Sequence, residues 1–360
     1  MLKKLSLAAL VAMGSMSVAS ATDLSEAIKG VELKGFVRLR VYHDANSDTT
    51  DHLNRYRTTT ALNFAIPVDD AIKFHTDYAY DWNMYEDAST TGKSYYGNTH
   101  FFVDYTKNKL NLLVGKIAVA TPVTGKGVGE ALGAGALATY GLNDNVTLAA
   151  AGLDTLANTD QVPVGGKNTY AGAVIYNSAD KKVSVQAWIF KVENLINRDV
   201  IVMANVKASD NLSVHFDYAN ADLDDSVSKY IQTFKNVNVT YTAGAVSAKV
   251  GFAANGVNGA VVSLDHDSPI ASVFATEQIT GIASGTKGDK AVYAKVGYKV
   301  DAQTNAYVAY TKTDDSGTEA LVGAKYAYSP KFNVGVYYSV LSKDDKEGNR
   351  ETRAEFKYSF

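Results

Sequence analysis

The 360-residue chain contains no cysteine, which excludes disulfide bonds and thiolate metal sites. Proline is also scarce: the five prolines, at positions 67, 122, 163, 269 and 330, all fall between segments of alternating hydrophobicity. Because proline cannot donate a hydrogen bond within a sheet, its absence leaves those segments free to pair as strands. Stability must then come from the sheet and its surroundings rather than from covalent cross-links.

Basic residues are not in excess, since 35 Lys and Arg stand against 38 Asp and Glu, a formal net charge of −3. That balance argues against a nucleic-acid partner, which usually needs a basic patch or stripe. Long apolar runs are also missing after residue 21, where no window approaches about 18 consecutive apolar residues. No membrane-spanning helix is therefore expected there, and only a closed β-barrel could cross a membrane.

The N-terminus has the form of a secretory signal. Two lysines precede an apolar run from Leu5 to Val18, and Ala19-Ser20-Ala21 has the small-x-small pattern of a cleavage site. The alternative, a short N-terminal membrane anchor, is disfavoured because the run is shorter than the roughly 20 residues that cross a bilayer as a helix. Removal of residues 1–21 leaves 33 basic and 38 acidic residues, a formal charge of −5, in one predicted domain of residues 22–360.

Strict alternation of apolar and polar residues over about ten positions, with a turn signal at each end, indicates a transmembrane β-strand. The pattern recurs along the whole chain, beginning where Val37 and Leu39 alternate with Arg38 and Arg40. The composition agrees, since 23 tyrosines and 13 phenylalanines supply the aromatic residues that strands favour. Further alternating segments are 74–82, 212–218, 246–252, 292–299, 333–340 and 353–360.

Alternation alone does not separate a soluble β-sandwich, whose apolar face points inwards, from a transmembrane barrel, whose apolar face points to lipid. Three features favour the barrel. No segment is apolar on both faces, tyrosines recur at strand ends as an interfacial girdle requires, and the chain ends on Phe360. A terminal phenylalanine that closes an aromatic-alternating strand resembles the C-terminal signal of outer-membrane barrel proteins.

The connections alternate in length, as short periplasmic turns and longer external loops do in such barrels. They predict an all-β, antiparallel transmembrane barrel of about 18 strands, with 16 to 18 plausible. Residues 119–132 are the candidate constriction loop, and 254–290 are interpreted as one long external loop in which 260–264 could form an extra strand. The short turns, rich in Asn, Asp, Gly and Pro, are expected at 67–70, 107–109, 143–145, 178–181, 209–211, 243–245, 301–304 and 329–331.

Residues 22–31, the segment Gly35-Phe36-Val37-Arg38-Leu39-Arg40 and Arg55-Tyr56-Arg57 on the next strand resemble the major outer membrane porin family of Campylobacter and related epsilonproteobacteria. The specific match covers roughly the first 60 residues and the closing strand, and the middle agrees only in pattern. The resemblance implies an eighteen-stranded homotrimeric porin of the outer membrane, with some cation preference and loops that face the host. It also implies a calcium ion near the constriction; no other cofactor is expected. The implied partners are outer-membrane lipid, lipopolysaccharide, ions and small hydrophilic solutes.

Parity along the strands predicts which charges line the channel. If Val37 and Leu39 face lipid, then Arg38 and Arg40 face the lumen, and barrel closure brings the last strand beside the first. The assignment is constrained by energy, since an Arg or Lys that faces lipid at the bilayer midplane costs about 2–4 kcal/mol. The predicted inward cations form one wall: Arg38, Arg40, Arg55, Arg57, Arg353 and Lys357.

Opposite charge is expected from Glu130 in the 119–132 loop, if that loop folds into the pore as the third loop of general porins does. Asp77, Asp81 and Asp104 on the third and fourth strands would add to it. The hypothesis is a transverse field that orients dipolar solutes and filters them by charge. The alternative is that inward charges only solvate a wet lumen.

Small residues are expected on the lipid-facing side of the first half of the chain, at Ala136, Ala138, Ala149 and Ala151. They could suit packing between subunits. They could equally face lipid.

The sequence therefore predicts an outer-membrane general porin, a passive diffusion channel rather than an enzyme. A surface adhesin or structural barrel is the alternative. An enzyme is less favoured because the six histidines show no motif spacing, and Asp265-His266-Asp267 is interpreted as an exposed polar turn. Calcium ligands cannot be named, because the aspartates at 222–225 and 314–315 are typical of solvated loop tips.

Overall fold

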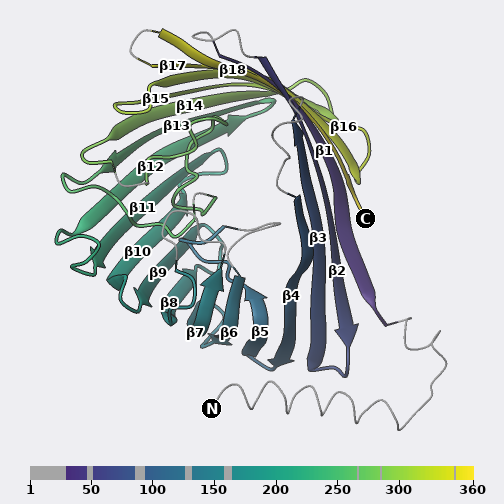
Figure 1. Ribbon diagram of the computed structural model, residues 1–360, viewed down its shortest axis with the longest axis vertical. Coiled ribbons are helices and arrows are strands. Elements are labelled where there is room, and N and C mark those ends of the chain that lie inside the picture. Colours follow the sequence, from purple (N-terminus) through teal and green to yellow (C-terminus); the bar gives the residue numbers. More distant parts are fainter. Residues whose placement is uncertain are drawn as a thin grey trace.

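The computed structural model describes residues 30–46, 52–85, 94–125, 132–157, 164–265, 267–283, 286–343 and 346–360. These residues form a closed antiparallel β-barrel of 18 strands, which confirms the predicted fold class (Figure 1). Within them, no helix has the length and apolar character for a membrane crossing. The predicted signal, residues 1–21, lies outside the described residues.

The strands are β1 (Glu32–Asn46), β2 (His52–Pro67), β3 (Ile72–Tyr85), β4 (Ser94–Lys107), β5 (Leu110–Ala118), β6 (Leu132–Gly141), β7 (Val146–Ala157), β8 (Thr169–Asn177), β9 (Val183–Val192), β10 (Ile196–Lys207), β11 (Leu212–Leu223), β12 (Gln232–Ala243), β13 (Val246–Asn255), β14 (Lys290–Lys299), β15 (Thr304–Thr313), β16 (Thr318–Ala327), β17 (Phe332–Lys343) and β18 (Lys346–Ser359).

Each strand pairs with its neighbours in chain order, and the barrel closes because β1 pairs with β18 as well as with β2. This closing ladder, the barrel seam, begins with Phe36 opposite Ser359. Just beyond it, the Gly35 N–H donates to the Phe360 carbonyl and the Phe360 N–H donates to the Gly35 carbonyl, both at 3.0 Å. The C-terminal residue therefore completes the seam.

The alternating residues separate an apolar outside from a polar inside. On β1, Val37 is 47% exposed on the outer surface, whereas Arg38 faces inwards and donates to the Thr59 hydroxyl at 3.1 Å. Residues directly opposite each other in a ladder share a face, so the register carries this parity around the barrel. Exposed apolar residues of the outer surface include Leu39, Tyr56, Tyr78, Val250, Val296, Val308, Val322, Val336 and Phe356. Such a surface is suited to contact with lipid.

Short turns join the strands at one end of the barrel. Those of the described chain lie at 68–71, 108–109, 142–145, 178–182, 208–211, 244–245, 300–303 and 328–331, within one or two residues of the predicted positions. In three of them, a side-chain oxygen of Asp69, Asn143 or Asp301 accepts the backbone N–H groups two and three residues later. Asn108 and Gly244 have φ values of 55° and 57°, which Asn and Gly tolerate. This local chemistry explains why composition alone locates the turns.

Two connections at the other end fold back into the barrel (Figure 1). L3 joins β5 to β6 (119–131), and L7 joins β13 to β14 (256–289). The described part of L3, residues 119–125, is largely buried, in agreement with the predicted inward fold. L7, predicted as one long external loop at 254–290, is a single connection at this end of the barrel, and its described residues are largely buried inside the barrel. Residues 260–264 are part of this packing and form no strand.

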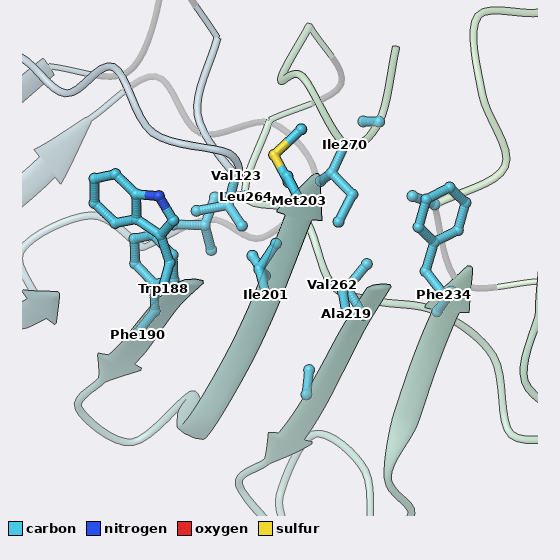
Figure 2. Packing of buried hydrophobic residues seen from close by; sticks show 14 of the residues in the cluster. Val123, Trp188, Phe190, Ile201, Met203, Ala219, Phe234, Val262, Leu264 and Ile270 are labelled. Carbon is cyan, nitrogen blue, oxygen red and sulfur yellow. The ribbon is translucent and has the colours of Figure 1, made fainter. Parts of the chain in front are cut away.

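L3 and L7 build an apolar core against the inner faces of β9 to β12 (Figure 2). Val123 of L3 and Leu264 and Ile270 of L7 are each 2% exposed or less. Burial of each such side chain contributes about 1.5–3 kcal/mol. The wall residues that belong to this core include Trp188, Phe190, Ile201, Met203 and Phe234. The two loops thereby fill one side of the barrel interior.

The predicted lipid-facing alanines divide between the two faces. Ala138 lies opposite Ala150 across β6 and β7, and Ala136 lies opposite Gly152, all on the outer surface. Ala149 has the opposite parity and is 7% exposed within the internal core, so its expected lipid contact is wrong, and Ala151 shares its inward parity. The prediction assigned the parity of β7 one residue out of phase, because a run of alanines carries no polar marker of the inner face.

Candidate functional site

The six predicted cations lie together on the inner faces of three adjacent strands, β18, β1 and β2. The register places Arg38 opposite Lys357 and Arg40 opposite Arg57 across the two ladders. Because strands at the barrel seam are neighbours, residues more than 300 positions apart in the chain share this surface. It is named the cation wall and consists of Arg38, Arg40, Arg55, Arg57, Arg353 and Lys357.

Aromatic rings lie beside four of these cations, with Phe36 beside Arg38 and Lys357. Tyr42, buried on the inner side of β1, has the Arg55 guanidinium carbon 3.9 Å from its ring centroid and that of Arg353 at 5.9 Å. Arg353 also lies 4.4 Å from the ring centroid of Tyr337. Cation–π contacts of this kind contribute about 0.5–1 kcal/mol at exposed sites and more where water is excluded. The guanidinium groups are thus fixed against the wall.

Carboxylates are interleaved with the cation wall. Arg40 forms an ion pair with Glu355, and Arg57 binds Asp81 through two guanidinium nitrogens, with the Nη2 to Oδ2 distance at 2.7 Å. The prediction placed Asp81 across the pore from the arginines. The structure places it beside them, because β3 is the neighbour of β2 and Asp81 faces the same wall. The wall therefore carries alternating charge rather than positive charge alone.

Arg55 lies between two further acids of the same wall. Its Nη2 atom is 3.7 Å from the Asp44 carboxylate and 3.5 Å from that of Glu351. Glu351 also accepts a hydrogen bond from the Tyr337 hydroxyl. Glu351 has the same parity on β18 as Arg353, so the alternation that predicted the cations also contained the signal for their acidic partners.

Asp77 and Asp104 lie on the inner faces of β3 and β4, where each lies near a histidine. His100 Nδ1 is 2.8 Å from Asp77 Oδ2, and His75 Nε2 is 3.7 Å from Asp104 Oδ2. Asp104 also lines a cleft of about 420 Å³ at the short-turn end of β1 to β4. These two acids line the interior but are not brought together with the cation wall.

Acids that oppose the wall come from L7. Glu277 Oε2 lies 3.0 Å from Arg353 Nη1, and Asp267 lies within electrostatic range of Arg57. Glu130 of L3, predicted for this role, lies outside the described residues. No sequence pattern indicated Glu277, because an irregular loop has no period that shows where its side chains point.

Asp265, interpreted above as part of an exposed polar turn, instead joins L7 to L3. It is 4% exposed, and its Oδ2 atom accepts the Gly125 N–H at 3.1 Å. Beside it, the Leu264 N–H donates to the Val123 carbonyl at 3.0 Å. His266 lies outside the described residues. The two inward loops are therefore tied into one unit.

Within the described residues, no group of three or more His, Asp or Glu side chains is arranged to hold a metal ion. The aspartate cluster at 222–225 has a local role: Asp224 accepts the Ser226 N–H at 3.0 Å and the Ser226 hydroxyl at 2.6 Å. These hydrogen bonds hold the pKa of the Asp224 carboxyl below its usual value. The calcium ion that the resemblance implies near the constriction stays a prediction.

Comparison with known proteins gives both a family and a fold. The protein family described as the Campylobacter major outer membrane protein matches residues 1–244 of this chain. Among curated proteins, none has a sequence that matches significantly.

Among solved structures, Pseudomonas aeruginosa OpdO is similar with a TM-score of 0.74 and 13% identity, over 94% of this chain and 99% of that one. Acinetobacter baumannii OccAB4 has a TM-score of 0.73 and 14% identity, over 92% and 98% of the two chains. The P. aeruginosa OpdK structure with vanillate has a TM-score of 0.73 and 12% identity, over 91% and 98%. At these identities the likeness shows the fold alone.

Proposed function

Because the chain belongs to the Campylobacter major outer membrane protein family and is a porin of the bacterial outer membrane, we propose that it is a non-enzymatic channel for passive diffusion of ions and small hydrophilic solutes. The observation that supports this most directly is the distribution of polarity. An apolar outer surface encloses an inner wall of paired charges, the arrangement of a water-filled lumen within lipid. The short turns then lie at the periplasmic end of the barrel and the longer loops at the external end.

Charge selectivity would come from the field between the cation wall and L7. Charges along a narrow, low-dielectric passage concentrate counter-ions and orient dipolar solutes. The six cations are matched by six acids in the described residues, so the balance favours orientation of dipolar solutes over strong rejection of either ion. Four of these acids lie on the wall and two on L7: Asp44, Asp81, Glu351, Glu355, Asp267 and Glu277.

The proposal is tested by recording from the purified mature protein in a planar lipid bilayer under a KCl gradient. Discrete conductance steps are expected, with a small reversal potential because the cations of the cation wall are matched by nearby acids. Heat-modifiable gel mobility, measured on the same preparation, reports whether the barrel is folded. A folded barrel that never conducts would contradict the channel function and favour an adhesin or a structural barrel.

Assembly as a homotrimer is the second part of the proposal. Small residues form a row on the outer surface of β6 to β8, where Ala138, Ala150 and Gly172 lie side by side across two ladders. A surface of small residues lets two barrels approach closely. This supports β6 to β8 as the subunit contact, although the same residues also suit contact with lipid.

Replacement of Ala138 by tryptophan tests the contact. If β6 to β8 pack against another subunit, the indole prevents close approach, and native electrophoresis is expected to show monomers where the unmodified protein shows trimers. Ala320→Trp is the matched control, since Ala320 is exposed on the outer surface of β16, on the opposite side of the barrel. Trimers in both variants would place the contact elsewhere.

A further inference from the structure

The tip of L7, residues 276–279, is held by one buried carboxylate of the barrel wall. Glu319 of β16 is 0% exposed. Its Oε1 atom accepts the Glu277 N–H at 3.1 Å, and its Oε2 atom accepts the N–H groups of Gln278 at 3.0 Å and Ile279 at 2.7 Å. Three consecutive backbone donors thus converge on a single side chain, and hydrogen bonds to an ionised carboxylate are stronger than those between neutral groups.

Neighbouring strands hold the same tip on either side of Glu319. The Thr276 hydroxyl lies 2.7 Å from the Thr311 hydroxyl of β15, and the Gln278 side-chain amide donates to the Ser339 hydroxyl of β17 at 2.7 Å. The tip is therefore bound across three adjacent strands, β15 to β17. A loop segment held by five such contacts has a defined position rather than a range of positions.

This attachment fixes where Glu277 lies. Its backbone N–H is bound to Glu319, while its carboxylate reaches β18, 3.0 Å from Arg353, and remains 36% exposed. Arg353 belongs to the cation wall, whereas Glu319 is buried away from water. Glu319 thus makes no direct contact with the lumen, but it determines the position of an acid that does.

We propose that Glu319 is a positioning residue for ion selectivity: it holds the L7 tip so that Glu277 opposes the cation wall at Arg353. This inference rests on the proposed channel function. A carboxylate suits the role because it accepts hydrogen bonds at both oxygens, whereas the amide of glutamine offers only one oxygen and adds two donors. Release of the tip leaves Arg353 without its facing acid and the local lumen more positive.

The experiment is a double-mutant cycle in planar bilayers with Glu319→Gln, Glu277→Gln and the combination of both. Glu277→Gln is expected to lower the cation-to-anion permeability ratio roughly threefold, as for loss of one charge about 12 Å from the ion path in water. Glu319→Gln is also expected to lower the permeability ratio, and to add open-channel noise because the L7 tip is released. The combined variant is expected to match Glu277→Gln, because Glu319 acts through Glu277.

Additive effects on the permeability ratio would overturn the proposal, because they would mean that Glu319 acts through its own charge. A Glu319→Gln channel identical to the unmodified one would also overturn the positioning role, and it would leave the porin function intact. Absence of conductance in the unmodified protein would instead contradict the porin function. Glu193→Gln, the same change at an exposed residue between β9 and β10, is the control and is expected to change nothing.

A second variant covers failure of Glu319→Gln to assemble. The combination of Thr276→Val and Gln278→Ala removes the hydrogen bonds of the tip to Thr311 and Ser339 and the one from Thr276 to the Ile279 carbonyl, and it alters no charge. It is expected to shift the permeability ratio in the same direction as Glu277→Gln, by a smaller factor. A folded channel of this variant with unchanged selectivity would overturn the proposal.

Discussion

Replacement of Arg38 and Arg40 together by glutamine is expected to raise the cation-to-anion permeability ratio roughly tenfold, because each lost charge about 12 Å from the ion path changes the free-energy difference between a passing cation and a passing anion by about 0.7 kcal/mol in water. The change also leaves Glu355 without its ion-pair partner Arg40. The local balance of the cation wall thus becomes negative. The measurement is the reversal potential of single channels under a KCl gradient.

Arg198→Gln provides the control for this pair, because Arg198 is an exposed arginine on β10, outside the cation wall. Its reversal potential is expected to equal that of the unmodified channel. If the double variant also keeps that value, the inward arginines only solvate the lumen, and the transverse field is not the basis of selectivity. Because salt screens exposed charges, the effect should also weaken as the KCl concentration rises.

Gly35→Val is expected to prevent formation of the folded barrel. A Cβ atom at this position would lie 2.2 Å from the Ala61 carbonyl oxygen of β2 and 3.0 Å from the Phe360 ring. Neither neighbour can move freely, because Phe360 exchanges two backbone hydrogen bonds with Gly35. Overpacking typically costs 1–3 kcal/mol, and more where backbone must shift. Here the shift would open the barrel seam.

The measurement is the fraction of heat-modifiable protein after refolding into detergent or lipid. Gly335→Val is the matched control, since Gly335 also lies within a strand, β17, and a Cβ atom there would meet nothing within 4 Å. It is expected to fold like the unmodified protein. A Gly35→Val barrel that folds equally well would show that the seam tolerates a displaced terminus.

The fold could be predicted from sequence because lipid on the outside and water on the inside together impose an alternation of apolar and polar residues along every strand. Each strand must present an apolar residue such as Val37 to lipid and a polar residue such as Arg38 to water, and this rule acts locally along the chain. The turns were predictable for a similar reason, since their residues act locally. The Asp69 side chain accepts a nearby backbone N–H, and Asn108 adopts the positive φ that its turn requires. The rule weakens where side chains are small, which is why the parity of Ala149 was assigned wrongly.

L7 could not be predicted in the same way. Leu264 and Ile270 are buried by a wall that is distant in sequence, so their positions depend on tertiary packing rather than on period. The cation wall followed from parity and barrel closure. The acids on the wall could have been predicted in the same way, because strand adjacency places Asp81 beside Arg57. The contact between Glu277 and Arg353 could not, because it requires the folded loop.

The apolar core beneath L7 has a consequence for the order of biogenesis. Until L7 docks, the inner faces of β9 to β12 would expose Phe190, Ile201 and Phe234 to a wet interior. Two separate burial steps are therefore needed. Insertion of the strands moves the apolar outer surface from water into lipid, and docking of L7 removes the apolar inner surface from the water of the lumen. A barrel that closes before L7 docks would be an aggregation-prone intermediate, because its apolar inner surface is exposed. Holdase chaperones that bind such surfaces would protect it from aggregation.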